Sequence, residues 1–260
     1  EQRDCYEIAI LKERNSRGGS EYIHKKFKKD LELTISRPRN NFPLKFGAKR
    51  HLLLAGGIGV TPMMAMIEEL ESQKADYVMH YCTRSREKTA FFKRLEIKAK
   101  EKKVYFHYDG GDPSKGLDLG QFLSAPEPGT NLYYCGPPSF MEAITKVTSH
   151  WEKNSLHYEY FSNKKLHQEP QCENKEFQVT ISSTGDVFTI PSDKTIIEVL
   201  RDNGFVIDTS CEDGYCGTCM TRFLDGEPEH RDVVLDDEDK QKFVLICCAR
   251  SKTSNLVLEL

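Results

Sequence analysis

Between residues 51 and 161, short apolar runs alternate with amphipathic segments. The run at 51–55 is continuous, as in a strand buried on both faces of a sheet, and the apolar positions at 63–71 have helical spacing. The alternation continues with predicted strands at 77–82, 104–108, 131–135 and 156–161 and predicted helices at 87–99, 119–123 and 139–151. Alternating β and α units predict a doubly wound parallel sheet, an α/β domain at residues 45–161.

A different pattern begins at residue 177, after a polar stretch at 162–175 that lacks periodicity and is typical of a linker. Strands are predicted at 177–182, 187–190, 219–224 and 255–260, with one helix at 195–203, which makes residues 176–260 a compact α+β domain. Residues 1–44 show strand patterns at 6–11 and 31–36. Two or three strands cannot enclose a core, so we expect no independent domain there.

Composition narrows the class of protein. The 260 residues are 38% hydrophobic with a mean hydropathy of -0.57, and no apolar stretch approaches the length of a membrane span. Nine cysteines without a secretory signal fit a reducing compartment, which predicts a cytoplasmic protein. The chain opens at Glu1, without an initiating Met and within a strand pattern, so we expect a processed or truncated chain.

The net charge of -3 conceals two halves of opposite sign. Residues 176–260 hold 17 acidic and 8 basic residues, a net charge of -9, whereas residues 1–175 hold 23 acidic and 29 basic residues, a net charge of +6. An acidic surface steers docking to a basic partner, although it also simply keeps a domain soluble. Nothing in the chain indicates binding to nucleic acid or to a membrane.

Four cysteines carry the strongest chemical signal. Cys211, Cys216 and Cys219 have the spacing C-x4-C-x2-C and Cys247 follows downstream, which is the ligand pattern of a plant-type [2Fe–2S] cluster. Zinc sites usually combine two short knuckles, and only one CxxC is present; a disulfide framework is a weaker alternative still. Cys248 stands beside Cys247, so the spacing alone leaves the fourth ligand open.

Two glycine-bearing turns are candidates for a nucleotide site. Gly56, Gly57 and Gly59 lie at a predicted strand-to-helix turn, where small residues let the backbone approach a diphosphate; Thr61 is the predicted helix N-cap and Pro62 the first helical residue. The G-x-G-x-x-G fingerprint is incomplete because Pro62 replaces its last glycine. The turn Cys135-Gly136-Pro137 ends another predicted strand. The alternatives are a tight, well-capped turn and a Gly-Pro turn with a buried thiol.

Taken together, both turns and the cysteine motif resemble the phthalate dioxygenase reductase family, to which vanillate demethylase and carnitine monooxygenase reductases are similar. The resemblance implies a flavin barrel, an NAD domain and a β-grasp ferredoxin domain, in that order. Residues 1–44 resemble only the C-terminal remnant of the barrel, since the family's Arg-x-Tyr-Ser flavin motif is absent. It also implies Cys247 as the fourth ligand, because Cys247-Cys248-Ala249-Arg250 resembles the family's Cys-Val-Ser-Arg.

The same resemblance assigns further roles. Electrons would pass from NADH through FMN to the cluster and on to the Rieske centre of a terminal oxygenase. Cys135 would lie near the nicotinamide, and Phe161 near the flavin ring, unless Phe161 is a core aromatic. Positions that resemble FMN-phosphate contacts are Gly18, Gly19 and Ser20, which alone should hold the flavin weakly or not at all.

Several alternatives stay open. Arg84 lies where an arginine can meet a 2′-phosphate, yet NADH-using relatives carry similar residues, so we expect NADH as the donor. The chain as given could be an electron-transfer fragment without turnover, or a reductase for a diiron monooxygenase. A zinc-stabilised nucleotide sensor is the non-redox alternative.

Overall fold

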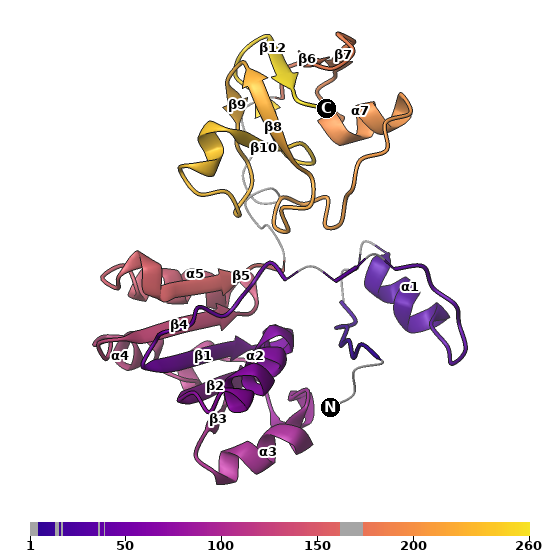
Figure 1. Ribbon diagram of the computed structural model, residues 1–260. Helices are drawn as coiled ribbons and strands as arrows, with labels where there is room; N and C mark the ends of the chain where they lie inside the picture. Colours follow the sequence, from indigo (N-terminus) through magenta and orange to yellow (C-terminus); the bar gives the residue numbers. More distant parts are fainter. Residues whose placement is uncertain (1–4, 14–15, 17, 36, 39, 162–173) are drawn as a thin grey trace. The chain divides into compact units, whose positions relative to one another are not determined.

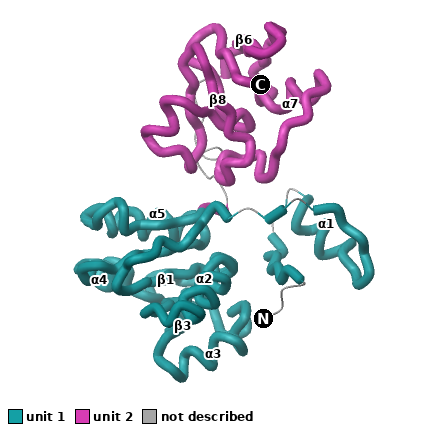
Figure 2. The backbone as a smooth tube through the Cα atoms, in the orientation of Figure 1, with its two compact units in different colours: residues 1–159 teal, residues 160–260 magenta. Residues whose placement is uncertain are grey.

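The computed structural model describes residues 5–13, 16, 18–35, 37–38, 40–161 and 174–260. The chain divides into two compact units, residues 1–159 and 160–260 (Figure 2). The predicted linker at 162–175 lies outside the described residues except for its last two. Among the described residues, no helix is both long and apolar enough to span a lipid bilayer.

The first unit is built on a five-stranded sheet in which every pairing is parallel (Figure 1). The strand order is β3-β2-β1-β4-β5, so the first strand of the sheet, β1, lies in the centre and the later strands add on either side of it. The strands are β1 (Arg50–Gly56), β2 (Tyr77–Thr83), β3 (Val104–Tyr108), β4 (Thr130–Cys135) and β5 (Leu156–Glu159). The predicted doubly wound α/β domain is confirmed.

Helices cover both faces of this sheet. Leu53 and Met79 share one hydrophobic core with residues of α2 (Val60–Ser72) and α3 (Phe92–Lys100). The intervening strand positions face the other helices: His80 packs on Phe122 of α4 (Leu119–Phe122) and Tyr134 meets Thr145 of α5 (Pro138–Val147). A sheet covered on both faces explains why its strands are continuous apolar runs.

The start of α2 differs from the prediction. A 3-10 turn, Gly57–Gly59, leads directly into the helix, so Gly59 is the N-cap and Val60 the first residue. Thr61 is therefore not the cap; its hydroxyl donates a hydrogen bond to the Ile58 carbonyl at 3.1 Å from inside the first turn. Pro62 is the third helical residue, where a missing N–H is still harmless because the first four N–H groups of a helix have no intrahelical partner.

The N-terminal segment also departs from the prediction. The described residues of 6–11 and 31–36 form no strand. Among the described residues of 1–44, the regular element is instead the helix α1 (Gly19–Lys26), which the sequence pattern had not indicated. Strands need a neighbouring backbone to bond to, and the described residues supply none here. Large apolar side chains are consequently exposed at alternate positions: Tyr6 and Ile8, and Leu31, Leu33 and Ile35.

The second unit contains a mixed five-stranded sheet of order β10-β8-β12-β6-β7. Its strands are β6 (Phe177–Ile181), β7 (Val187–Ile190), β8 (Met220–Asp225), β10 (Phe243–Leu245) and β12 (Asn255–Leu258), and only the β12–β6 pairing is parallel. A two-stranded sheet joins β9 (Pro228–Glu229) to β11 (Arg250–Ser251). This α+β unit agrees with the predicted ferredoxin domain.

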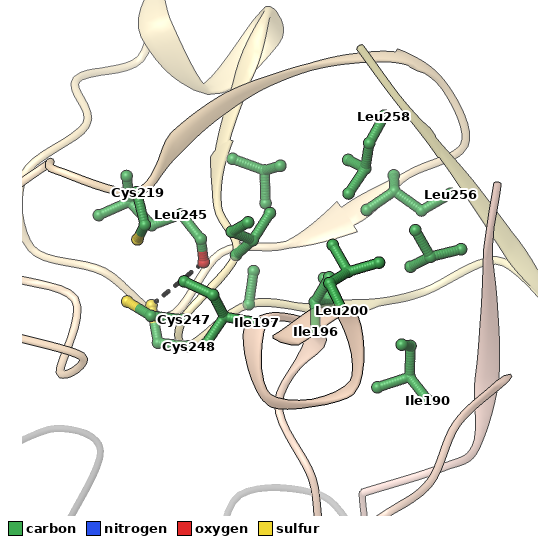
Figure 3. Close-up of a cluster of buried hydrophobic side chains, with 14 of the residues drawn as sticks. Ile190, Ile196, Ile197, Leu200, Cys219, Leu245, Cys247, Cys248, Leu256 and Leu258 are labelled. Atoms are coloured by element: carbon green, nitrogen blue, oxygen red, sulfur yellow. Dashed lines mark hydrogen bonds between the residues drawn. The ribbon is translucent and has the colours of Figure 1, made fainter. Parts of the chain in front are cut away.

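One helix, α7 (Ile196–Asp202), closes the core of this unit. Its first turn carries a capping box between Thr195 and Glu198, which the pattern T-x-x-E provides. Ile196 and Leu200 are fully buried in the same core as Leu256. Cys219, Cys247 and Cys248 lie at one end of this core, away from Ile190 (Figure 3). The core therefore supports the segments that carry the cysteines.

Candidate functional site

The two glycine turns meet at the carboxyl edge of the parallel sheet. Strands β1 and β4 are neighbours, and Ala55 pairs with Cys135 at their ends. A Cβ on Gly56 would lie 2.9 Å from the Pro137 ring, and one on Gly136 would lie 3.0 Å from the Cα of Gly56. Side chains at these positions would separate the turns. The edge of an open α/β sheet where the strand order reverses is where such folds bind ligands.

Two residues outside the predicted set complete this arrangement. The hydroxyl of Tyr81 donates to the carbonyl of Gly57 at 2.9 Å, which holds the turn in its positive-φ conformation, 53°. The ring of Phe140, in α5, fills the space that a Cβ on Gly56 or Gly136 would need. Neither residue gives a signal in the sequence, because both contacts arise from strand register and helix packing.

Cys135 is fully buried at the end of β4, and its strand partner is Glu159 at the end of β5. Burial raises the pKa of the Cys135 thiol far above its ordinary value, and the Glu159 carboxylate raises it further. Burial also raises the pKa of Glu159. The thiol therefore stays protonated and uncharged at neutral pH, so Cys135 is a buried neutral group next to the glycine turns.

Arg84 lies at a different strand end from the glycine turns. It follows β2, is exposed, and its carbonyl accepts a hydrogen bond from Gly110 at 2.9 Å in the loop after β3. The guanidinium of Arg86 already has two partners. It forms an ion pair with the Glu96 carboxylate at 3.2 Å, and its central carbon lies 4.3 Å from the centre of the Phe92 ring. Of the two arginines after β2, Arg84 is exposed and is the better placed to offer its guanidinium to a ligand.

The residues predicted to serve a flavin lie elsewhere in the chain. Gly18, at φ 112°, is the N-cap of α1, and Gly19 and Ser20 form its first turn. Ser20 bonds to Ser16 at 3.0 Å. Phe161 lies two residues beyond β5 and is 36% exposed, which does not fit the alternative of a core aromatic.

Four cysteines of the second unit come together. Cys211, Cys216 and Cys219 lie along one loop, and Cys247 follows β10 on a buried turn. The Cys247 thiol is hydrogen-bonded to Cys211 and Cys219 and also to its neighbour Cys248, and Cys211 bonds to Cys216 as well. Cys248 turns its sulfur to the Leu245 carbonyl, 3.6 Å away (Figure 3). These contacts favour Cys247 over Cys248 as the fourth member of the set.

The loop favours negative charge on its sulfurs. Hydrogen bonding from Cys247, with further bonds from Cys216 and from the N–H groups of Tyr215 and Asp213, lowers the pKa of Cys211 to about 5. The N–H of Asp213 lies 3.4 Å from the Cys211 sulfur, and that of Thr218 lies 3.5 Å from the Cys216 sulfur. Thiolates that receive backbone N–H bonds are the donors an iron–sulfur cluster requires.

The loop's backbone fits that role as well. Gly214 and Gly217 have φ values of 71° and 74°, a conformation that lets N–H groups turn toward the sulfurs. Across the described part of the chain, no three His, Cys, Asp or Glu side chains converge on a position for a single metal ion.

Comparison with known proteins identifies the two kinds of domain. Residues 53–146 match the family of oxidoreductase NAD-binding domains, and residues 179–252 match the family of 2Fe-2S iron-sulfur cluster binding domains. The tert-butanol monooxygenase / tert-amyl alcohol desaturase reductase subunit of Aquincola tertiaricarbonis is 45% identical over all of this chain and 79% of its own length. Phthalate dioxygenase reductase of Burkholderia cepacia is 37% identical over all of this chain and 80% of its own length.

Solved structures show the same similarity. The structure of a phthalate dioxygenase reductase, described as modular for electron transfer from pyridine nucleotides to [2Fe–2S], matches 96% of this chain and 78% of its own with a TM-score of 0.64 and 37% identity. An intact type IV self-sufficient cytochrome P450 monooxygenase matches 97% of this chain with a TM-score of 0.79 and 36% identity, although this chain spans only 33% of that protein.

The fold and the two sites define an NAD-dependent iron–sulfur oxidoreductase, which moves electrons from a nicotinamide nucleotide to a [2Fe–2S] cluster. The chain belongs to the phthalate dioxygenase reductase family of oxygenase reductases.

Proposed function

We propose that this protein carries electrons from NADH, through FMN and its [2Fe–2S] cluster, to the Rieske centre of a terminal oxygenase. One observation carries the proposal. A single chain holds two touching glycine turns at a sheet edge and a set of four cysteines, three on one loop and one on a separate turn, that are joined by thiol hydrogen bonds. The first arrangement suits a dinucleotide and the second a one-electron carrier.

At the nucleotide end, the chain's residues bind and orient. The turns of Gly56, Gly59 and Gly136 bring backbone close to a diphosphate, and the N-terminus of α2 adds free N–H groups and positive potential. The neutral thiol of Cys135 borders the same turns, which supports a nicotinamide site beside it. Arg84, at the end of β2, is positioned for the adenosine half, and we assign NADH as the donor.

A flavin is needed between the two sites, because it accepts two electrons as a hydride and releases them singly. Gly18, Gly19 and Ser20 open the helix α1, and N–H groups at a helix N-terminus suit a phosphate. Phe161 is sufficiently exposed to stack on a ring system. Apolar side chains at alternate positions of 6–8 and 31–35 are exposed. The strands of a flavin barrel would expose the same pattern of side chains if they had no neighbouring strands.

At the acceptor end, the proposed cluster ligands are Cys211, Cys216, Cys219 and Cys247. Relatives named as reductases of phthalate dioxygenase and vanillate O-demethylase favour an oxygenase as acceptor. The net charge of -9 over residues 176–260 suits a basic docking surface on that partner. The cytoplasmic location remains a prediction from the cysteine content.

A second acceptor is favoured by one observation. The self-sufficient cytochrome P450 matches nearly all of this chain at 36% identity, so this module also occurs joined to a haem monooxygenase. A haem protein is therefore the main competitor to a Rieske protein, ahead of the diiron monooxygenase considered from the sequence alone.

The function is tested with the cluster-loaded chain, kept anaerobic. NADH is added with and without FMN, and the acceptor is a purified Rieske-type oxygenase component, a cytochrome P450 or cytochrome c. We expect reduction that depends on added FMN and is fastest with the Rieske component. Faster reduction of the cytochrome P450 would contradict the Rieske assignment, and FMN-independent reduction would contradict the flavin step.

A further inference from the structure

A short segment of the second unit braces the cysteine loop. The N–H of Val233 donates to the carbonyl of Gly214 at 3.1 Å, and the side chain of Val234 lies 3.6 Å from the position that a Cβ on Gly217 would occupy. Both glycines stand between cysteines of the loop. The placement of this segment therefore bears directly on the loop that carries three of the proposed cluster ligands.

Asp232 anchors this segment from inside the protein. Its side chain is 0% exposed, and its Oδ2 accepts hydrogen bonds from the N–H groups of Val234 at 3.2 Å and Leu235 at 2.8 Å. Its Oδ1 faces the Nδ1 of His230 at 3.7 Å. Both atoms are buried, and neither has a hydrogen-bond partner among the described residues.

The tautomer of His230 follows from its other nitrogen. Nε2 lies 3.1 Å from the carbonyl oxygen of Lys240, and a carbonyl only accepts hydrogen bonds, so Nε2 carries the hydrogen. A neutral imidazole then presents the lone pair of Nδ1 to the carboxylate of Asp232. Two buried acceptors that face each other are unfavourable, and a single proton between them would create a charge-assisted hydrogen bond.

We propose that the His230–Asp232 pair takes up one proton when the neighbouring cluster is reduced. The proton comes from solvent and binds Nδ1 of His230; the electron comes from NADH in the proposed relay or from a chemical reductant. Reduction adds one negative charge to the cluster, and the proton adds one positive charge to His230. The N–H at Nδ1 then donates a hydrogen bond to Oδ1 of Asp232. Because the site is buried, the attraction between the two charges is weakly screened. The inference rests on the proposed cluster ligands.

The surrounding charges leave His230 ready to accept this proton. Burial is the main cause that lowers the pKa of His230; the charge of Asp232 and the hydrogen bond to the Lys240 carbonyl oppose it, and the charges of Lys240 and Lys252 lower the pKa further. Beside the pair, Arg231 is bound to Glu229 at 2.8 Å, so these two charges largely offset each other. The imidazole therefore tends to carry one hydrogen before the cluster gains its negative charge.

The test is the reduction potential of the cluster as a function of pH. His230 is the only histidine in residues 174–260, and the second unit's other histidine, His167, lies outside the described residues, so the variants below assign an imidazole titration to His230. In the cluster-loaded chain, titrated with dithionite between about pH 5.5 and 9, the potential should fall as pH rises. One proton per electron sets an upper limit of about 59 mV per pH unit, the equivalent of a tenfold change for one electron.

Two variants remove the proton site without removing the turn. Asp232→Asn keeps an oxygen for the two N–H groups and offers an amide hydrogen to Nδ1, whereas His230→Gln keeps an N–H for the Lys240 carbonyl. Both should give a potential that is independent of pH. Asp237→Asn removes an exposed carboxylate from the same loop and should keep the original slope.

The outcomes are decisive in either direction. A reduction potential that does not change with pH in the unsubstituted chain would overturn the proposal. This result does not depend on whether the variants take up a cluster. An unchanged slope in Asp232→Asn or His230→Gln would also overturn it. A chain that takes up no cluster, shown by its absorption spectrum, would contradict the ligand set and the proposal together. None of these measurements uses NADH or an oxygenase, so failure of the proposed relay gives a different result.

Discussion

A Cβ placed on Gly59 would overlap the backbone carbonyl of Cys135. The turn after β1 and the turn after β4 are therefore a single packed structure, and the N-cap residue of α2, Gly59, packs against Cys135, the last residue of β4. A nucleotide bound at this edge would meet both turns at once. The nucleotide site consequently depends on the absence of a side chain at Gly59.

We expect Gly59→Ala to weaken both NADH binding and the first unit. The added methyl group must displace backbone, which costs about 1–3 kcal/mol or more in a packed region. Unfolding of this unit can be followed by the fluorescence of Trp151, the only tryptophan. The control is Gly19→Ala, where a Cβ meets nothing within 4 Å. Equal NADH affinity in the two variants would contradict the packing described.

The choice between adjacent cysteines gives a sharp comparison. Cys247→Ser should abolish or strongly alter the visible spectrum and the electron paramagnetic resonance signal of the reduced cluster, because the Cys247 thiol meets those of Cys211 and Cys219. Cys248→Ser should retain both, since the Cys248 sulfur is directed to the Leu245 carbonyl. Loss of the cluster in Cys248→Ser alone would reverse the assignment.

Cys135 should resist alkylation. Its raised pKa keeps the thiol protonated at pH 8, and only thiolates react readily with iodoacetamide. In the folded chain, mass spectrometry should find the exposed Cys5 modified and Cys135 unmodified. Comparable labelling of the two residues would show that the strand end at Cys135 is open to solvent.

Acid should destabilise the first unit through His80. Burial lowers the pKa of His80 to about 4, and the adjacent His107 and Arg50 lower it as well. The unfolded chain therefore binds more protons between about pH 6.5 and 4, so the unit loses stability as pH falls through this range.

The measurement is thermal unfolding at about pH 7.5 and 5, followed by Trp151 fluorescence. His80→Phe, whose ring can pack on Phe122, should reduce the difference between the two melting temperatures. The exposed His150→Gln is the control and should leave it unchanged. If the melting temperature changes equally between the two pH values in His80→Phe and in the parent chain, His80 is not the group that causes the loss of stability in acid.

The parallel sheet was predictable because strands buried on both faces appear as continuous apolar runs between amphipathic helices. The cysteine loop was predictable because ligand spacing is a local property of the chain. By contrast, the alternation at 6–11 and 31–36 suggested strands that the described residues do not form, since periodicity does not supply a pairing partner. The strand β10, of three residues, is too short to show a pattern.

Contacts across the fold were the least predictable. Glu159 meets Cys135 only because β5 pairs with β4 in that register, and Tyr81 meets Gly57 only because β2 lies beside β1. The pairing of His230 with Asp232 spans two residues, yet its burial depends on the packing of a whole loop. Such contacts determine the chemistry of a site whose location the sequence had already indicated.

The most direct test of the account is whether NADH reduces the cluster. The cluster-loaded chain, supplied with FMN and kept anaerobic, is titrated with NADH and frozen for electron paramagnetic resonance. We predict the same reduced-cluster signal that dithionite produces, abolished or strongly altered in Cys247→Ser and weakened in Gly59→Ala. A signal with dithionite but none with NADH and FMN would contradict the proposed path of electrons from the glycine turns to the cysteine loop.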